Sequence, residues 1–177
     1  LRVDLHVRRR GVVHHARLGI RVADAAYGHE LLGHAEPFSQ TGGHGDFRGP
    51  GENILDECLC CAGMGRICDG IAEVQKAARD ELRRGAHHVK IMASGGVASP
   101  TDRIDSTQFS LDELKAIVDE CEAANRYACA HAYTARAVNR ALECGVRSIE
   151  HGNLIDAESC EIFKAKGAYL VPTLSTY

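Results

Sequence analysis

The sequence lacks the long apolar run that a membrane-spanning helix requires. No stretch approaches the roughly 20 consecutive apolar residues that cross a bilayer. Residues 1–10 also lack the apolar centre of a secretory signal. We therefore expect a soluble protein with no membrane partner, and we expect it in the cytoplasm.

Concentrated positive charge is also missing. The 21 Lys and Arg residues are outnumbered by 24 Asp and Glu, and they are scattered along the chain. Because proteins that bind a phosphate backbone gather basic side chains on one face, no nucleic-acid partner is expected. With 45% hydrophobic and 25% charged residues over 177 positions, the sequence is typical of a globular domain with a sizeable core.

The eight cysteines do not have the distribution of a disulfide framework. Four stand alone in helix-like or strand-like segments, as free buried thiols do: Cys121, Cys129, Cys144 and Cys160. The other four form a cluster: Cys58, Cys60, Cys61 and Cys68. A cluster can hold zinc or an iron–sulfur centre, but we favour a cysteine-rich loop in a reducing compartment.

Helical and strand-like patterns alternate from residue 69 onward. Helices are predicted from Asp69 to Gly85, from a Ser110–Glu113 capping box to Cys121, from Thr134 to Gly145, and from Asp156 to Gly167. Strands are predicted around Lys90 and at 127–131, 147–151 and 168–174. Such alternation produces βαβ units and a parallel sheet, so the predicted fold class is α/β.

The number of units leaves two architectures open. A closed eight-fold barrel needs about 250 residues, and about four or five units are visible, so the chain supplies roughly half of one. An open doubly wound sheet fits the length better, but no Gly-x-Gly-x-x-Gly follows a strand to mark a dinucleotide site.

The first 38 residues show no sustained helical or strand period, and we leave 1–38 unassigned. They contain five histidines without a His-x-His pair, which we interpret as solvated. The chain begins with Leu1 and stops at Tyr177 directly after an apolar run, so we expect it to be a piece of a longer protein.

Side chains able to bind a metal follow three predicted strands. Lys90, His131 and His151 each stand at the end of one, and strand ends converge on one face of a parallel barrel. Neutral imidazoles are ligands for zinc and related metals. A neutral lysine amine can add carbon dioxide to form a carbamate, which is an anion like a carboxylate. A glycine-rich loop at 40–50, which carries His44 and Asp46, can approach a ligand closely.

Four motifs carry a family resemblance. Val-Lys-Ile-Met-Ala-Ser-Gly-Gly, Ala-His-Ala-Tyr-Thr, Ile-Glu-His-Gly-Asn and, at 39–46, Ser-Gln-Thr-Gly-Gly-His-Gly-Asp resemble the amidohydrolase superfamily. The match is closest to its prolidase-like and imidazolonepropionase-like dipeptidase branch. It covers 39–177, and it implies a partial TIM-type (β/α) barrel made of roughly the middle to later βα units.

The resemblance also implies a chemistry. It implies metal-dependent hydrolysis of C–N bonds in small substrates such as dipeptides or N-acyl amino acids, with two divalent metals, usually Zn²⁺, and a metal-activated hydroxide. Lys90, carbamylated by CO₂, would bridge the metals, with His131 and His151 as ligands. Tyr133 and His44 would hold a substrate carboxylate. The family's first metal uses His-x-His and a late Asp, and neither is found in this sequence.

Two alternatives remain open at this stage. Lys90 could act as the Schiff-base lysine of an aldolase-type barrel, because a lysine beside small residues can be desolvated and made nucleophilic. The 177 residues could also be an inactive piece that folds by association, for example as a homo-oligomer, because an unclosed sheet exposes an edge.

Overall fold

The computed structural model describes residues 4–9, 12–17, 21–22, 36–51 and 65–173. The strands are β1 (Asp4–Arg9), β2 (Val12–Arg17), β3 (Arg21–Val22), β4 (Phe38–Ser39), β5 (Arg66–Ile67), β6 (His88–Met92), β7 (Tyr127–Thr134), β8 (Ser148–Leu154) and β9 (Tyr169–Val171). The helices are α1 (Ile71–Arg83), α2 (Leu111–Ala123), α3 (Ala135–Glu143) and α4 (Ala157–Lys166). Among the described residues, no helix is long and apolar enough to cross a membrane.

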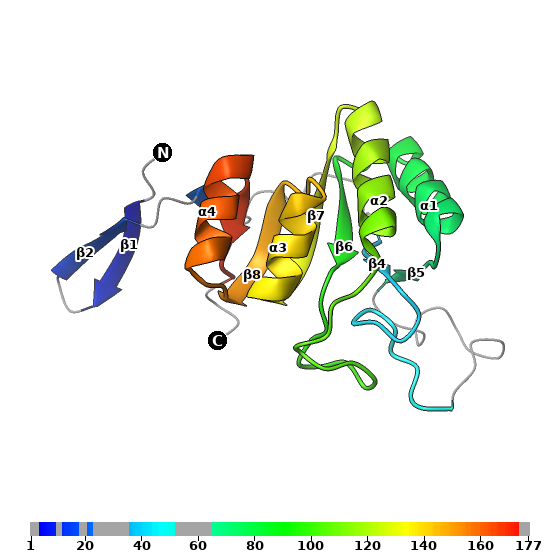
Figure 1. The fold of residues 1–177 in the computed structure, drawn as a ribbon, viewed down its shortest axis with the longest axis horizontal. Coiled ribbons are helices and arrows are strands. Elements are labelled where there is room, and N and C mark those ends of the chain that lie inside the picture. The colour runs from blue at the N-terminus through cyan, green and yellow to red at the C-terminus, as the bar shows by residue number, and fades with distance from the viewer. Residues whose placement is uncertain (1–3, 10–11, 18–20, 23–35, 52–64, 174–177) are drawn as a thin grey trace.

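One parallel sheet of seven strands organises the chain, in the order β3-β9-β8-β7-β6-β4-β5. From β6 to β9 each strand lies beside the next strand in sequence, with one helix in each connection. Figure 1 shows the four helices side by side along the sheet, and successive helices contact each other. This winding is that of part of a (β/α) barrel, since a doubly wound sheet reverses its strand order and covers both faces. The predicted α/β class and partial barrel are confirmed.

Helix starts follow the predicted capping residues in three of four helices. Ser110 and Glu113 form the predicted capping box of α2. Thr134 caps α3, and Asp156 caps α4, which ends at the left-handed Gly167. The cap predicted for α1 is wrong. Gly70 occupies that position, because the carboxylate of Asp69 instead accepts hydrogen bonds from Thr41 in another loop.

Two strands run further than the sequence predicts. β7 continues through Tyr133 to Thr134, and β8 continues to Leu154, so His131 and His151 lie inside their strands rather than at the ends. The apolar pattern stops at these histidines because their polar side chains face the site, while the backbone continues to pair. Lys90 likewise lies inside β6, which is flanked by β4 and β7 and is therefore not an edge strand.

The core lies between the sheet and its helices. Val89, Ile91, Ala130 and Ile149 from the strands pack with Ile117 and other apolar residues of the helices, and all five are fully buried. The predicted free thiols Cys121, Cys129, Cys144 and Cys160 form no disulfide, and neither does Cys68. Cys121 and Cys129 are buried as predicted, whereas Cys144 and Cys160 are only partly buried. Of the predicted cysteine cluster, Cys58, Cys60 and Cys61 lie outside the described residues.

Part of the unassigned segment 1–38 does form strands. β1 and β2 pair as an antiparallel hairpin, and β3 adds to the large sheet beside β9. These strands are not predicted above, although Leu1, Val3, Leu5 and Val7 alternate with polar residues in the pattern of a strand. The division into 1–38 and 39–177 stays a prediction.

Candidate functional site

Four aromatic side chains gather at one end of the sheet. The His131 ring stacks on His44, with centroids 4.3 Å apart and planes at 20°. It also meets the edge of His151 at 4.9 Å and of Tyr133 at 4.8 Å, and Tyr133 stacks on His151 at 5.1 Å. The structure therefore brings together His44, His131, Tyr133 and His151, which the sequence nominates from three separate segments.

Lys90 lies deeper along the sheet than the histidines. In the register of the parallel strands it pairs with Cys129, whereas His131 pairs with Met92, and His151 pairs with Ala132. The three side chains therefore come from different levels of the sheet. Lys90 is still close enough for its positive charge to lower the pKa of His44, His131 and His151.

Both candidate metal-binding histidines are neutral at physiological pH. Burial lowers the pKa of His131 to about 3, and the charges on neighbouring His44, His151 and Lys90 act in the same direction. Burial, followed by the charge on Lys90, lowers the pKa of His151 to about 4. A neutral imidazole keeps the lone pair that a metal needs.

Hydrogen bonds select which ring nitrogen of each histidine is engaged. His131 Nε2 lies 3.2 Å from the carbonyl oxygen of Gly95. A carbonyl only accepts, so Nε2 carries the proton and Nδ1 keeps its lone pair. His151 Nδ1 lies 2.7 Å from the hydroxyl of Thr173, so Nε2 is the ring nitrogen of His151 that remains to bind a metal. Metal-bound histidines usually bind a second group in this way.

His151 occupies an unusual backbone position. Its φ is 74°, in the left-handed region that residues other than glycine rarely adopt, and the pairing of β7 with β8 shifts register just beyond it. Such irregularities in a sheet re-aim a side chain, and they are common beside functional sites. His151 meets His131 although the two do not pair directly, and the left-handed backbone at His151 sets its side chain apart from a regular pleat.

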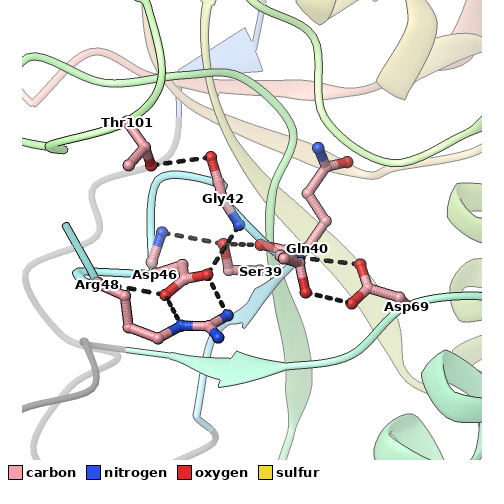
Figure 2. A network of polar contacts seen from close by, with 9 residues as sticks. Ser39, Gln40, Gly42, Asp46, Arg48, Asp69 and Thr101 are labelled. Carbon is pink, nitrogen blue, oxygen red and sulfur yellow. Dashed lines mark hydrogen bonds and ion pairs between the residues drawn. The ribbon is translucent and has the colours of Figure 1, made fainter. Parts of the chain in front are cut away.

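A network of polar contacts holds the loop that carries His44 (Figure 2). Asp46 is buried and accepts hydrogen bonds from the Gly42 amide at 2.8 Å and from the guanidinium of Arg48. Thr41 binds Asp69, and the Thr101 hydroxyl donates to the Gly42 carbonyl at 3.3 Å. Asp46, which the sequence marks as a polar residue of a glycine-rich loop, therefore stabilises the loop that positions His44.

Ser94 and Gly96 also belong to the site, although no role is predicted for them from the sequence. Ser94 is buried, donates to the Gly95 carbonyl and accepts from the Tyr133 amide. Gly96 lies against the His44 ring, where an added Cβ would come within 1.9 Å of Cε1. The signal was the Ala-Ser-Gly-Gly motif, because small residues after a strand permit close approach.

The donor set fits part of a metal centre. His131 Nδ1 and His151 Nε2 are available, and a carbamate on Lys90 would add an anionic oxygen ligand. An uncarboxylated lysine is not a ligand, and no group of three His, Cys, Asp or Glu within the described ranges could hold a metal ion. The residues therefore fit one metal bound by two imidazoles and a carbamate, and they do not by themselves provide the ligands of a second.

The comparison with known families decides the relationship. The sequence model of the amidohydrolase family matches residues 11–177. The chain belongs to the amidohydrolase family. This membership agrees with the partial barrel and with the residues gathered at its face.

Several family members are similar in sequence or structure. The ochratoxinase of Aspergillus niger is 40% identical over 146 residues, which cover 77% of this chain and 30% of that protein. A prolidase complexed with N-methylphosphonate-L-proline superposes with a TM-score of 0.73 and 56% identity, over 78% of this chain and 35% of that one. A Xaa-Pro dipeptidase with bound methionine superposes with a TM-score of 0.68 and 32% identity, over 78% of this chain and 34% of that one. The chain thus spans about a third of the length of these amidohydrolases.

Proposed function

We propose that the protein hydrolyses C–N bonds in small substrates such as dipeptides or N-acyl amino acids, with a divalent metal held by His131, His151 and a carbamate on Lys90. The observation that carries this proposal is the convergence of two neutral imidazoles, 4.9 Å apart between centroids, beside a lysine on the adjacent parallel strand. The metal, Zn²⁺ or a related ion, supplies when bound the Lewis acidity that activates water and polarises an amide carbonyl.

Lys90 can form a carbamate only after its ammonium group has lost a proton. The neutral amine attacks CO₂, forms an N–C bond and releases one proton, and the product is a carbamate anion. Lys90 is half-buried on β6 with His44, His131 and His151 around it. The low pKa of His131 and of His151 keeps both rings uncharged. The carbamate of Lys90 and the lone pairs of the two imidazoles could therefore bind the same cation.

Tyr133 and His44 supply the binding side of the same site. Tyr133 presents a phenol, which is a hydrogen-bond donor, and its ring contacts both His131 and His151. His44 stacks on His131 from a different loop. We assign both to the free carboxylate of the substrate. The similarity to a prolidase and to a Xaa-Pro dipeptidase supports a substrate of this class.

Metal analysis of the full-length protein, purified without chelator and assayed on a dipeptide panel, tests the proposal. We expect bound zinc, manganese, cobalt or iron, and hydrolysis that a chelator abolishes. The variants His131→Ala and His151→Ala should lose metal, whereas the matched control His88→Ala should keep it, because His88 packs on Tyr127 away from the site. A protein without any of these metals and without hydrolysis contradicts the proposal.

Schiff-base chemistry at Lys90 is the alternative, and it gives His131 and His151 no role. Borohydride reduction in the presence of a carbonyl substrate separates the two readings. We expect no covalent label on Lys90. Since the described residues provide ligands for only one metal, we further propose that the 177-residue chain alone is catalytically incomplete. Hydrolysis of a dipeptide by that isolated chain contradicts this second point.

A further inference from the structure

The ladder of hydrogen bonds between β6 and β7 changes its acceptor next to the site. In a parallel pair, a residue of one strand donates to a carbonyl of its neighbour and accepts from the amide two residues further on. The Ala93 amide donates to the His131 carbonyl at 2.9 Å, so a regular ladder would continue from the Tyr133 amide to the Ala93 carbonyl. The Tyr133 amide instead donates to the hydroxyl oxygen of Ser94 at 3.2 Å.

The Ala93 carbonyl has a different partner. It accepts from the backbone amide of Gln108 at 2.9 Å, where the loop that follows β6 returns to the sheet. This bond holds the returning loop against the end of β6, and it engages the carbonyl that the ladder would otherwise use. The Tyr133 amide therefore pairs with a side chain, and β6 ends at Met92 while β7 continues to Thr134.

The contacts of Ser94 fix its hydroxyl in this position. The side chain is fully buried, and the residue forms a bridge with Thr107 in the returning arm of the loop. The hydroxyl donates its proton to the Gly95 carbonyl at 2.9 Å, so the oxygen keeps its lone pairs for the Tyr133 amide. The same Gly95 carbonyl lies 3.2 Å from Nε2 of His131. One hydroxyl thus connects the backbone of Tyr133 to the carbonyl that binds the His131 ring.

We propose that Ser94 is a positioning residue, whose hydroxyl takes the place of the Ala93 carbonyl in the ladder and sets the position of Tyr133 at the site. The consequence for binding rests on the proposed role of Tyr133 toward a substrate carboxylate. Without the hydroxyl, the amide of this buried residue loses its acceptor, and the end of β7 must shift to find another. That shift carries the phenol away from the carboxylate.

Hydrogen exchange of the Tyr133 amide tests the ladder itself. It is measured by NMR on full-length protein labelled with nitrogen-15 tyrosine, and Tyr133→Phe identifies the signal by its loss. In Ser94→Ala the amide should exchange about tenfold faster, because its acceptor is gone. Ser159→Ala is the matched control, since it removes an equally buried hydroxyl that binds Asp156 at the start of α4 rather than a strand. An unchanged exchange rate in Ser94→Ala overturns the proposal.

A double-mutant cycle separates positioning from general damage to the fold. Ser94→Ala should raise the KM for a dipeptide about tenfold with little change in kcat. Metal content should be retained, because the Gly95 carbonyl still binds His131. Combined with Tyr133→Phe, the substitution should raise KM no further, since the contact through which Ser94 acts is already lost. A KM that rises by the product of the two separate effects overturns positioning through Tyr133.

Ser94→Cys serves if Ser94→Ala is not recovered as a folded protein. A thiol is a weaker acceptor than a hydroxyl, so amide exchange and KM should change in the same direction by a smaller factor. The inference and the proposed function fail separately. If the full-length protein hydrolyses no dipeptide, the proposed function fails, while amide exchange still decides whether Ser94 completes the ladder.

Discussion

His44 and His131 stack face to face, 4.3 Å apart, although one comes from a glycine-rich loop and the other from the middle of β7. The contact joins the proposed binding side of the site to the proposed metal side. It also has an electrostatic effect, since a charge on His44 adds to burial in lowering the pKa of His131. A change in the charge of His44 should therefore change the pKa of His131.

Replacing Lys90 tests the carbamate. In Lys90→Ala of the full-length protein we expect metal content and hydrolysis to be lost, because the anionic ligand is gone. A short carboxylic acid, added with the metal, should restore part of the activity, since its carboxylate can occupy the space of the carbamate.

The control for this test is Lys76→Ala, which removes an exposed lysine of α1. It should behave like the unmodified protein. Full metal content and activity in Lys90→Ala would exclude the proposed role of Lys90.

Tyr133→Phe tests recognition of the substrate carboxylate. A hydrogen bond to a charged group contributes roughly 1.5–3 kcal/mol, so its loss should raise KM about 10- to 100-fold. We expect kcat to change much less, and we expect the variant to discriminate poorly between a dipeptide and its C-terminal amide.

Tyr127→Phe is the matched control, since Tyr127 begins the same strand and packs on His88 rather than at the site. Equal effects of the two substitutions on KM would argue against a role for the Tyr133 hydroxyl.

Gly96→Ala should displace His44 without disturbing the metal. A Cβ at this position would lie 1.9 Å from Cε1 and 2.0 Å from Nδ1 of the ring. Because the ring must move, we expect KM to rise about tenfold, equivalent to about 1.4 kcal/mol, with metal content retained. Ala98→Ser, on an exposed position of the same loop, should have no such effect. A crystal structure of the variant with His44 in its original position contradicts the expectation.

Asp46 should make the stability of the His44 loop depend on pH. Hydrogen bonds from Arg48 and Gly42 outweigh the effect of burial and hold the pKa of Asp46 below its usual value. A carboxylate with a lowered folded pKa stabilises the protein above its unfolded pKa of about 3.9, and the contribution is lost as the pH falls through the folded value. The free energy of unfolding of Asp46→Asn should therefore be lower than that of the unmodified protein by roughly 1.5–3 kcal/mol near neutral pH, and the gap should close in acid.

Urea unfolding of Asp46→Asn and of the unmodified protein, from neutral to acidic pH, measures the difference in their free energies of unfolding. Asp119→Asn is the control, because Asp119 forms an exposed ion pair with Lys115 that solvent screens. A gap for Asp46→Asn that stays constant down to strongly acidic pH would contradict the assignment.

Local signals in the sequence are sufficient where a structure depends on neighbouring residues. The capping box at Ser110 and the caps at Thr134 and Asp156 are found where predicted, since the bonds they make reach only three residues along the chain. Asp69 has the same capping chemistry, but its carboxylate binds Thr41, and that competing partner is distant in sequence. The prediction for α1 fails for that reason.

In the candidate site, too, some features follow from local sequence and others depend on contacts between distant segments. The sequence by itself determines the α/β alternation and names Lys90, His131, His151, Tyr133 and His44, because each lies in a short recognisable motif. Only the tertiary structure decides that His131 and His151 meet from two neighbouring strands, that Lys90 lies deeper along the sheet, and that Ser99 and Gln108 bind His44. The physical reason is that register, bulges and contacts between loops depend on how distant segments pack, and no local pattern records them.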